Sequence, residues 1–475
     1  MSIRSLRHAG SGRCGFLKVV APFLTDDSLP FARFLSARRI EGVFAEHDGL
    51  FGLHGVYSTA ITLWAFLSQV LRDGKEASCQ AAVARVVSHC GQAGANTPSS
   101  DTGEYCRARG KLSEGALRDL TCGLADELEA SADDAWLWKG KHAKLVDGFT
   151  FTMPDSDANQ AEYPQAKTQK PGLGQPIARA AAVLSLATGC VLNATFGRYS
   201  GKKTGETALL RNMLDSFSEG DVAVMDRYYC SFMMIALLLS RGVQTCMRKH
   251  HLLKTEFRRV KRLGKNDHLL IWMRPQRPSW MDKETYARIP ERLVLREISY
   301  RVVEPGCRPE RVDVITTLTN PEEYTAEEIA ELYGFRWNSE LDIRSIKDSL
   351  NLGHLRCKSP KMIRLEFWTT LLAYNLIRTT AAGAALLHGK QPRSISFTGA
   401  CQYVLASWML FSCGLVDPTR VCEQVRRALE HIAQCEVANR PGRLEPRVVK
   451  QRPKPYPIMT KPRAMLRDEL SNQRR

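Results

Sequence analysis

The sequence predicts an α/β protein built on a mixed sheet with helices on both faces. Between residues 144 and 247, three strand-like segments follow one another, and helical and strand-like segments then alternate. Residues 1–135 mostly carry apolar residues at helical spacing, and residues 249–318 are rich in strand-like segments. These observations predict a helical N-terminal region, a mixed-sheet core and a β-rich insertion.

The individual elements follow from local patterns. Helical spacing predicts helices within 59–87, 105–128, 206–217, 229–239, 325–350, 362–378 and 400–410. β-branched and aromatic residues predict strands at 144–153, 177–186, 191–196, 221–226 and 243–247, and three more within the insertion. A polar loop is predicted after the first strand, from residue 154 to residue 172.

These elements divide the chain into consecutive regions. The core is split in two by the insertion, and the last region has 11 basic and 3 acidic residues with 6 prolines, which predicts a flexible tail. The regions are a helical N-terminal region (1–135), the first part of the core (140–248), the insertion (249–320), the second part of the core (321–380), a C-terminal helical region (381–439) and the tail (440–475).

Charge is the strongest signal in the composition. With 67 Lys and Arg against 50 Asp and Glu, the net charge is +17, which favours a polyanionic partner such as nucleic acid. A basic but inert surface is the alternative. Hydrophobic residues make up 44% of the chain, so wholesale disorder is excluded.

Neither a membrane span nor a secretory signal is expected, because no uncharged apolar run of about 18 residues occurs and the basic N-terminus has no long apolar stretch. We therefore expect an intracellular protein. The 14 cysteines are scattered without a C-x-x-C pair, which argues against zinc-finger spacing and predicts reduced, packed thiols.

One stripe of a predicted helix carries polar residues of mixed charge. Tyr333, Arg336, Glu340 and Lys347 fall within an arc of about 60° if each residue advances the helix by about 100°. A stripe of this length, about 21 Å, could follow several phosphates, and a carboxylate between cations stays ionised and suits a metal ion. An ordinary surface salt-bridge pattern is the alternative, because Arg336 and Glu340 are spaced i, i+4.

Two aspartates stand in or at the end of apolar strands. Asp147 interrupts the strand at 144–153, and Asp226 ends the strand at 221–226. A carboxylate there is costly unless it is paired or binds a metal ion, and strand ends that bring two carboxylates together can hold Mg²⁺. For each aspartate alone, a turn or capping role is the alternative.

Together these motifs resemble those of bacterial DDE transposases of the insertion-sequence-four family. The resemblance rests on Asp147-Gly148, Asp226-Arg227 and the spacing Tyr333-x2-Arg336-x3-Glu340-x6-Lys347, and it covers roughly residues 30–380. It implies an RNase H-like core with the β-rich insertion before the glutamate helix. In one departure from many relatives, Phe149 stands where they have Thr after the glycine.

The resemblance also implies site roles. Asp147, Asp226 and Glu340 become the catalytic, metal-binding triad for two Mg²⁺ ions, with Mn²⁺ as a substitute. Tyr333, Arg336 and Lys347 become contacts to transposon-end DNA, and Arg227 assists beside the second aspartate.

The expected reaction is cleavage at transposon ends by an activated water, followed by attack of the freed 3′-OH on target DNA. The implied assembly is a homodimer on two DNA ends in the bacterial cytoplasm, associated with the nucleoid. Hairpin-forming relatives stack a flipped base on an aromatic residue of the insertion, for which Trp272 and Trp280 are candidates, with core packing as the alternative for each.

Other polar residues receive simpler interpretations. Glu206 is expected to be an acid at a helix N-terminus, His250 and His251 part of a DNA-facing surface, and Asp155 and Asp157 turn residues.

Two alternative functions remain at this point. One is an RNase H-like nuclease that cuts DNA without transposing it, and the other is a catalytically inactive DNA-binding protein derived from a transposase.

Overall fold

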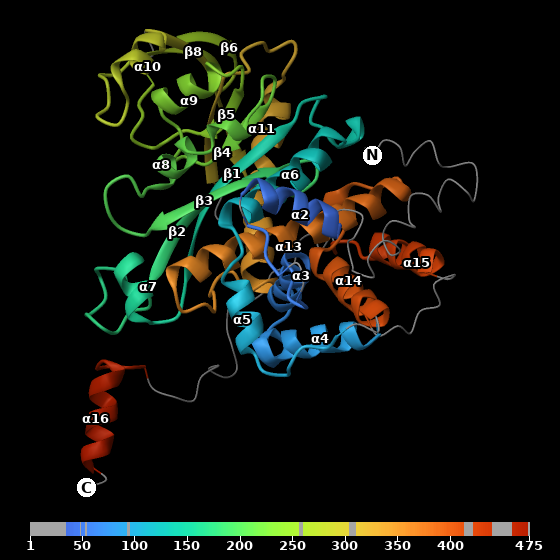
Figure 1. Ribbon diagram of the computed structural model, residues 1–475. Helices are drawn as coiled ribbons and strands as arrows, with labels where there is room; N and C mark the ends of the chain where they lie inside the picture. Colours follow the sequence, from blue (N-terminus) through green and yellow to red (C-terminus); the bar gives the residue numbers. More distant parts are fainter. Residues whose placement is uncertain are drawn as a thin grey trace.

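A nine-stranded mixed sheet forms the centre of the computed structural model (Figure 1). The structure describes residues 35–47, 49–52, 55–92, 96–255, 260–303, 310–412, 421–438 and 458–473. The strands run in the order β3-β2-β1-β4-β5-β9-β8-β7-β6. Their bounds are β1 Ala143–Thr152, β2 Ile177–Ser185, β3 Val191–Arg198, β4 Val222–Met225, β5 Gln244–Arg248, β6 Val260–Gly264, β7 Asp267–Met273, β8 Arg292–Val302 and β9 Glu310–Thr316.

Pairing within the sheet is both parallel and antiparallel. Strands β1, β2 and β3 form an antiparallel meander, while β4 and β5 run parallel to β1. Strand β9 returns antiparallel to β5, and β8, β7 and β6 continue antiparallel from it. The predicted mixed α/β class is therefore confirmed.

The β-rich insertion does not form a separate sheet. Because β9 pairs with β5 through Cys246 and Thr316, the strands β6–β8 extend the same sheet from its β9 side. The buried side chain of Arg296 on β8 binds Asp267 and also donates to the backbone carbonyl of Tyr324, which lies just before the next helix. These bonds fix the inserted strands to the segment that leads to Glu340.

The helices before the sheet are shorter than the pattern predicted. They are α2 Ala37–Glu46, α3 Thr59–Val70, α4 Cys79–Gln92, α5 Gly103–Arg109 and α6 Glu114–Ala130. The predicted helix over 59–87 is interrupted between Val70 and Cys79, and Gly74 in this interruption has a φ of 53°, outside the helical region. The predicted helix over 105–128 breaks after Arg109, and the Ser113 side chain then caps α6 by accepting from Ala116 N.

Short helices fill the connections between strands. They are α7 Asp157–Glu162, α8 Glu206–Arg211, α9 Phe232–Leu239 and α10 Lys283–Arg288. Helix α7 lies in the segment predicted to be a loop, where Ser156 caps the helix by accepting from Asn159 N.

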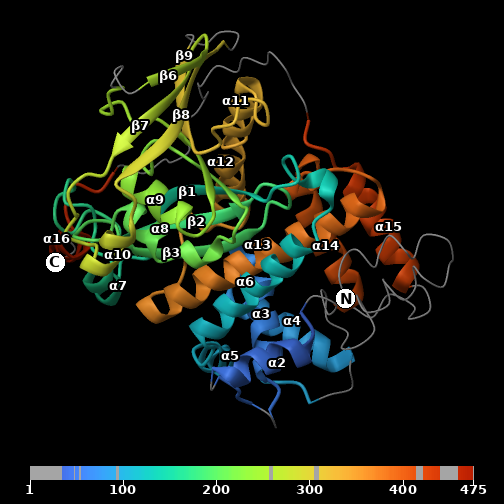
Figure 2. The ribbon, with the colours of Figure 1, turned by 90° about the horizontal axis from the view of Figure 1, so that it is seen from above.

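One long helix joins the N-terminal helices to the sheet. Helix α13, Pro360–Leu387, is buried along most of its length and crosses beside α6 and α3 (Figure 2). The side chain of Asn375 on α13 donates to the carbonyls of Thr121 and Val191 and accepts from the Val191 amide. Because all these groups are buried, the bonds fix α6 and the edge strand β3 on either side of α13.

Two further helices, α14 Phe397–Ser412 and α15 Val421–Gln434, pack near α13, and α16 Arg463–Gln473 lies apart from them (Figure 1). Within the predicted tail over 440–475, α16 forms because the prolines end at Pro462 and leave a segment of helix formers. Residues 440–457 lie outside the described residues.

No helix among the described residues is long and apolar enough to cross a membrane. The cysteines of the described ranges are free thiols, and most of them are buried, as predicted.

Candidate active site

The parallel pairing of β1 and β4 ends just before the two predicted aspartates and brings them together. Val146 on β1 pairs with Met225 on β4, so the next residues, Asp147 and Asp226, are neighbours. Carboxyl ends of parallel strands meet at one edge, where ligands usually bind. The Asp226 carboxylate accepts from Tyr228 N at 2.7 Å, and the bond holds the turn that follows β4.

The four residues of the predicted stripe do not lie on one continuous helix. Tyr333 belongs to α11 Ala326–Gly334, and Arg336 precedes α12 Trp337–Arg344, which carries Glu340. Lys347 lies in a π-helical turn over Ser345–Ser349.

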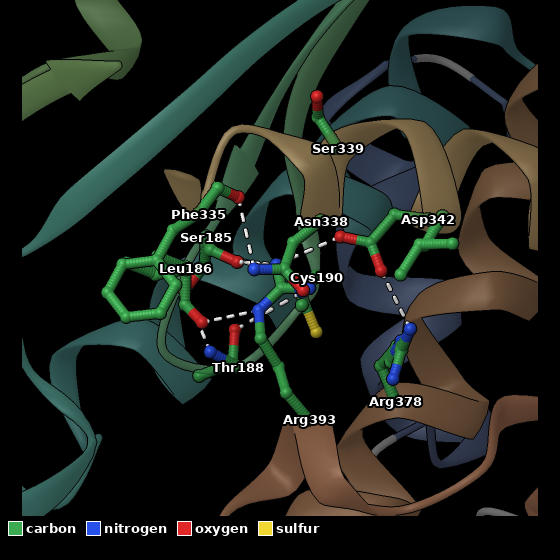
Figure 3. Close-up of polar contacts among 12 residues, drawn as sticks. Ser185, Leu186, Thr188, Cys190, Phe335, Asn338, Ser339, Asp342, Arg378 and Arg393 are labelled. Carbon is green, nitrogen blue, oxygen red and sulfur yellow. Dashed lines mark hydrogen bonds and ion pairs between the residues drawn. The ribbon is translucent and has the colours of Figure 1, made fainter. Parts of the chain in front are cut away.

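The break has a local cause. Around Phe335 the backbone bonds shorten from i, i+4 to i, i+3, and the Asn338 side chain donates to the Phe335 carbonyl (Figure 3). All four side chains nevertheless line the same cavity.

A buried ion-pair cluster holds the opposite face of α12. Asp342 is fully buried, and its two oxygens accept from Arg378 Nη2 at 2.7 Å and from Arg393 Nη2 at 2.9 Å (Figure 3). The Arg393 guanidinium also donates to the backbone carbonyls of Ser185 and Leu186 at the end of β2. The helix that carries Glu340 is therefore fixed between α13 and the sheet.

A wide, polar cavity of about 780 Å³ opens where these elements meet. It is lined by all seven residues that the sequence assigned to the site: Asp147, Asp226, Arg227, Tyr333, Arg336, Glu340 and Lys347. Six cationic and five acidic side chains line it in total, so anionic and cationic groups can both be bound there.

Arg336 bridges two of the acids. Its guanidinium lies 2.5 Å from Glu340 Oε1 and 3.6 Å from Asp147 Oδ2. Burial alone would lower the pKa of Arg336, but the hydrogen bond to Glu340 and the negative charges of Glu340 and Asp147 outweigh it and raise the pKa. Arg336 is therefore a permanent cation between β1 and α12.

The two aspartates sit in a partly desolvated environment. Burial raises the pKa of Asp147, although the hydrogen bonds from Ser339 Oγ and Gly148 N and the charge of Arg336 act against it. Burial also raises the pKa of Asp226. Their ionised forms therefore need compensation by a cation.

The donor set suits a hard divalent cation, because it offers carboxylate oxygens that already lack full solvation. Among the residues that the structure describes, however, no three His, Cys, Asp or Glu side chains are grouped closely enough to hold a metal ion as they lie. Glu340, whose side chain is 39% exposed, is engaged by Arg336 and would have to turn toward the aspartates.

Several residues of the cavity were missed by the sequence analysis. Arg248 ends β5, and because Met225 pairs with Met247 it follows Asp226 along the sheet edge. The carboxyl-end rule applied to the predicted strand at 243–247 could have found it. Arg344, four residues after Glu340 on the predicted helix, could have been found from helical spacing. Arg179 and Tyr199 gave no such signal, since only folding brings them to the cavity.

Of the other residues that the sequence singled out, the two tryptophans and the two histidines lie outside this cavity. Trp272 is partly buried against the core, whereas Trp280 is 38% exposed, with the Arg211 guanidinium 3.9 Å from its ring centre. His250 and His251 stack on each other at 4.4 Å. Phe149 lines the cavity but is buried, and it packs near Phe151.

Comparison with known proteins identifies the family. Residues 138–376 match the family model described as the transposase DDE domain. The chain belongs to the DDE transposases.

Two bacterial transposases are similar to this chain in sequence. The transposase InsG for insertion sequence element IS4 of Escherichia coli K12 is 26% identical over 376 residues, and the match covers 77% of this chain and 80% of that protein. The chain is 38% identical over 69 residues to the putative transposase y4zB of Sinorhizobium fredii, covering 14% of this chain and 19% of that protein.

A solved piggyBac transposase synaptic complex with hairpin DNA aligns over 88% of this chain and 85% of that one, with a TM-score of 0.40 and 9% identity. The family model and the similarity to InsG confirm the predicted family, the transposase function and the DDE enzyme class.

Proposed function

We propose that this transposase cuts DNA at transposon ends and joins the freed ends to target DNA through an RNase H-like core whose triad is Asp147, Asp226 and Glu340. The observation that carries the proposal is that β1, β4 and α12 bring these three acids to one polar cavity. Asp147, Asp226 and Glu340 would hold two divalent ions, Mg²⁺ or Mn²⁺, which supply water activation and charge neutralisation when bound.

The protein's own groups hold the acids of the proposed triad in place. Ser339 Oγ and the Gly148 amide donate hydrogen bonds to the Asp147 carboxylate, and Arg336 binds Glu340. In the first reaction, water attacks the phosphodiester and the P–O3′ bond breaks, which leaves a 3′-OH. That hydroxyl then attacks a target phosphodiester and displaces its 3′ oxygen.

The cationic side chains of the cavity bind the DNA backbone. Lys347, Arg227 and Arg336 line the same cavity as the acids, and Tyr333 adds a polar hydroxyl to its wall. Contacts of this kind fix the register of the duplex without reading its sequence. We infer that the helical region 1–135 contributes recognition of the ends, that a homodimer holds two ends, and that the protein acts at the nucleoid in the cytoplasm.

Glu340→Gln tests the catalytic assignment. It keeps the size of the side chain but removes its charge, so we expect end cleavage to be lost and DNA binding retained. The substrate is a pair of inverted-repeat duplexes, taken from the DNA that flanks the reading frame, together with a target plasmid. Glu331→Gln on α11, an exposed residue outside the cavity, is the matched control.

The assay separates transposition from simple nuclease activity and tests the site. Joined products with the wild type and none with Glu340→Gln support transposition by this site. Cleavage without joining by the wild type would indicate a nuclease. Unchanged cleavage by Glu340→Gln would refute the site.

A further inference from the structure

A fourth acidic side chain reaches the cavity from an element outside the predicted triad. Glu206 begins α8, between β3 and β4, and it lines the cavity with Asp147 and Asp226. The sequence assigned it only to the first turn of a helix, and that position is correct. A helix-terminal role alone does not explain why the side chain turns toward the aspartates.

The backbone beside Asp147 leaves room for this carboxylate. A Cβ atom on Gly148 would lie 2.2 Å from Glu206 Cδ and 2.5 Å from Glu206 Oε2, which is closer than atoms can approach. The glycine therefore lets Glu206 lie directly against the strand that carries Asp147.

Glu206 has little compensation for its charge. Its nearest cation is Arg179, whose Nε is 4.0 Å away, and the Arg179 guanidinium lies over the Tyr199 ring, 4.7 Å from the ring centre. Burial and the negative charge of Asp226 raise the pKa of Glu206. A group of carboxylates with so few counter-charges is stabilised when a cation joins it.

A buried phenol gives a second, independent indication of a missing ligand. Tyr229 is fully buried, and its hydroxyl has no hydrogen-bond partner among the described residues. Glu206, Asp147 and Asp226 lie close enough for their charges to add to burial in raising its pKa. A buried hydroxyl without a partner is rare, and this one lies near enough to the three carboxylates for their charges to act on it.

We propose that Glu206 is a fourth carboxylate of the metal centre and that it holds the second divalent ion together with Asp226. The inference rests on the proposed function, because it presumes an ion at the aspartates. Glu206 supplies its oxygen from α8, whereas Glu340 comes from α12. The Tyr229 hydroxyl supports this ion by a hydrogen bond to Glu206 or to a water on the ion.

Manganese binding to the full-length protein tests the proposal without relying on activity. Free Mn²⁺ is followed by electron paramagnetic resonance during titration. We expect two ions per chain for the wild type and, for Glu206→Gln, a second ion bound at least about tenfold more weakly. Glu104→Gln is the matched control, because Glu104 is also in the first turn of a helix but is exposed and outside the cavity.

Other variants distinguish the possible failures. If circular dichroism shows that Glu206→Gln does not fold, Glu206→Asp is the alternative variant. It keeps the negative charge but has a shorter side chain, so its oxygen is drawn back and the affinity for the second ion should fall in the same way. Wild-type binding by Glu206→Gln or Glu206→Asp, together with loss of an ion in Asp226→Asn, would overturn this inference alone. Wild-type binding by Asp147→Asn and Asp226→Asn would overturn the metal assignment of the proposed function.

Discussion

At the scale of single residues, burial and neighbouring charges together set the pKa values of the site. Three acids of the cavity have raised pKa values, first because of burial, while Arg336 supplies a fixed cation on one side of them. The arginine pairs with Asp147 and Glu340, so Asp226 and Glu206 are left to other partners. Without bound cations, the buried carboxylates lower the free energy of unfolding, and cations that bind to them raise it again.

The cost can be measured at Asp226. Since burial raises the pKa of Asp226, the folded state binds its proton more tightly than the unfolded chain. Its contribution to stability is therefore present in acid and is lost as the pH rises from the ordinary value of 3.8 through the raised pKa. In EDTA at pH 7, Asp226→Asn should unfold at a higher temperature than the wild type, and this gain should shrink toward acid pH.

With Mg²⁺ present, the wild type should unfold at a higher temperature than Asp226→Asn. Mg²⁺ should raise the unfolding temperature of the wild type and have less effect on the variant, which lacks the Asp226 carboxylate. Asp73→Asn, an exposed aspartate far along the chain from the site, is the control and should change neither curve. A variant less stable than the wild type in EDTA at pH 7 would contradict the argument.

At the scale of elements, α12 is held from its buried face so that Glu340 can face the cavity. Asp342 lies two residues after Glu340 and accepts from two arginines, one on α13 and one just before α14. Both Arg378 and Asp342 are almost fully buried. Removing one member of such a cluster leaves a charge without compensation in the interior.

Asp342→Ala should therefore lower the free energy of unfolding by about 3–5 kcal/mol. Urea unfolding followed by circular dichroism measures the change. Because α12 loses its anchor, end cleavage should also fall. Asp348→Ala, an exposed residue in the following turn, is the stability control and should stay within about 0.5 kcal/mol of the wild type. A loss of less than about 1 kcal/mol for Asp342→Ala would show that the cluster does not hold the helix.

The elements also show where sequence reasoning succeeds and fails. Strand patterns located β1, β4 and β5 to within a few residues, because buried parallel strands are short apolar runs with clear ends. The helix of the signature was predicted as one piece, but the i, i+3 bonds around Phe335 divide it. The four residues still meet because the kink and the π turn place them at one cavity, which a helical wheel cannot foresee.

At the scale of the whole molecule, distant segments complete the site. The sequence placed the triad in one pocket through the family resemblance, and the fold supplies a reason in strand register. Arg179, Arg248 and Arg344 reach the cavity from β2, β5 and α12, which lie far apart in the sequence. The fold thus adds cationic groups to a cavity in a chain whose net charge is already +17.

This surplus of positive charge predicts steep salt dependence for DNA binding. If about six phosphates are neutralised, affinity should fall by roughly a thousandfold between 50 and 200 mM salt. Lys347 lines the cavity and forms no ion pair within the described part of the chain, so it is free to bind a phosphate. Lys347→Ala should therefore lower the slope of log affinity against log salt by about 1 and should reduce end cleavage more than nonspecific binding.

Filter binding over a salt series, combined with the cleavage assay, tests both parts of this prediction. Lys167→Ala removes an exposed lysine outside the cavity and should leave cleavage unchanged. If Lys347 only adds to the general positive field, its loss would reduce cleavage and nonspecific binding by the same factor. If it positions the scissile phosphate against the acids, cleavage falls further than binding, because a small displacement of a reacting group costs more rate than affinity.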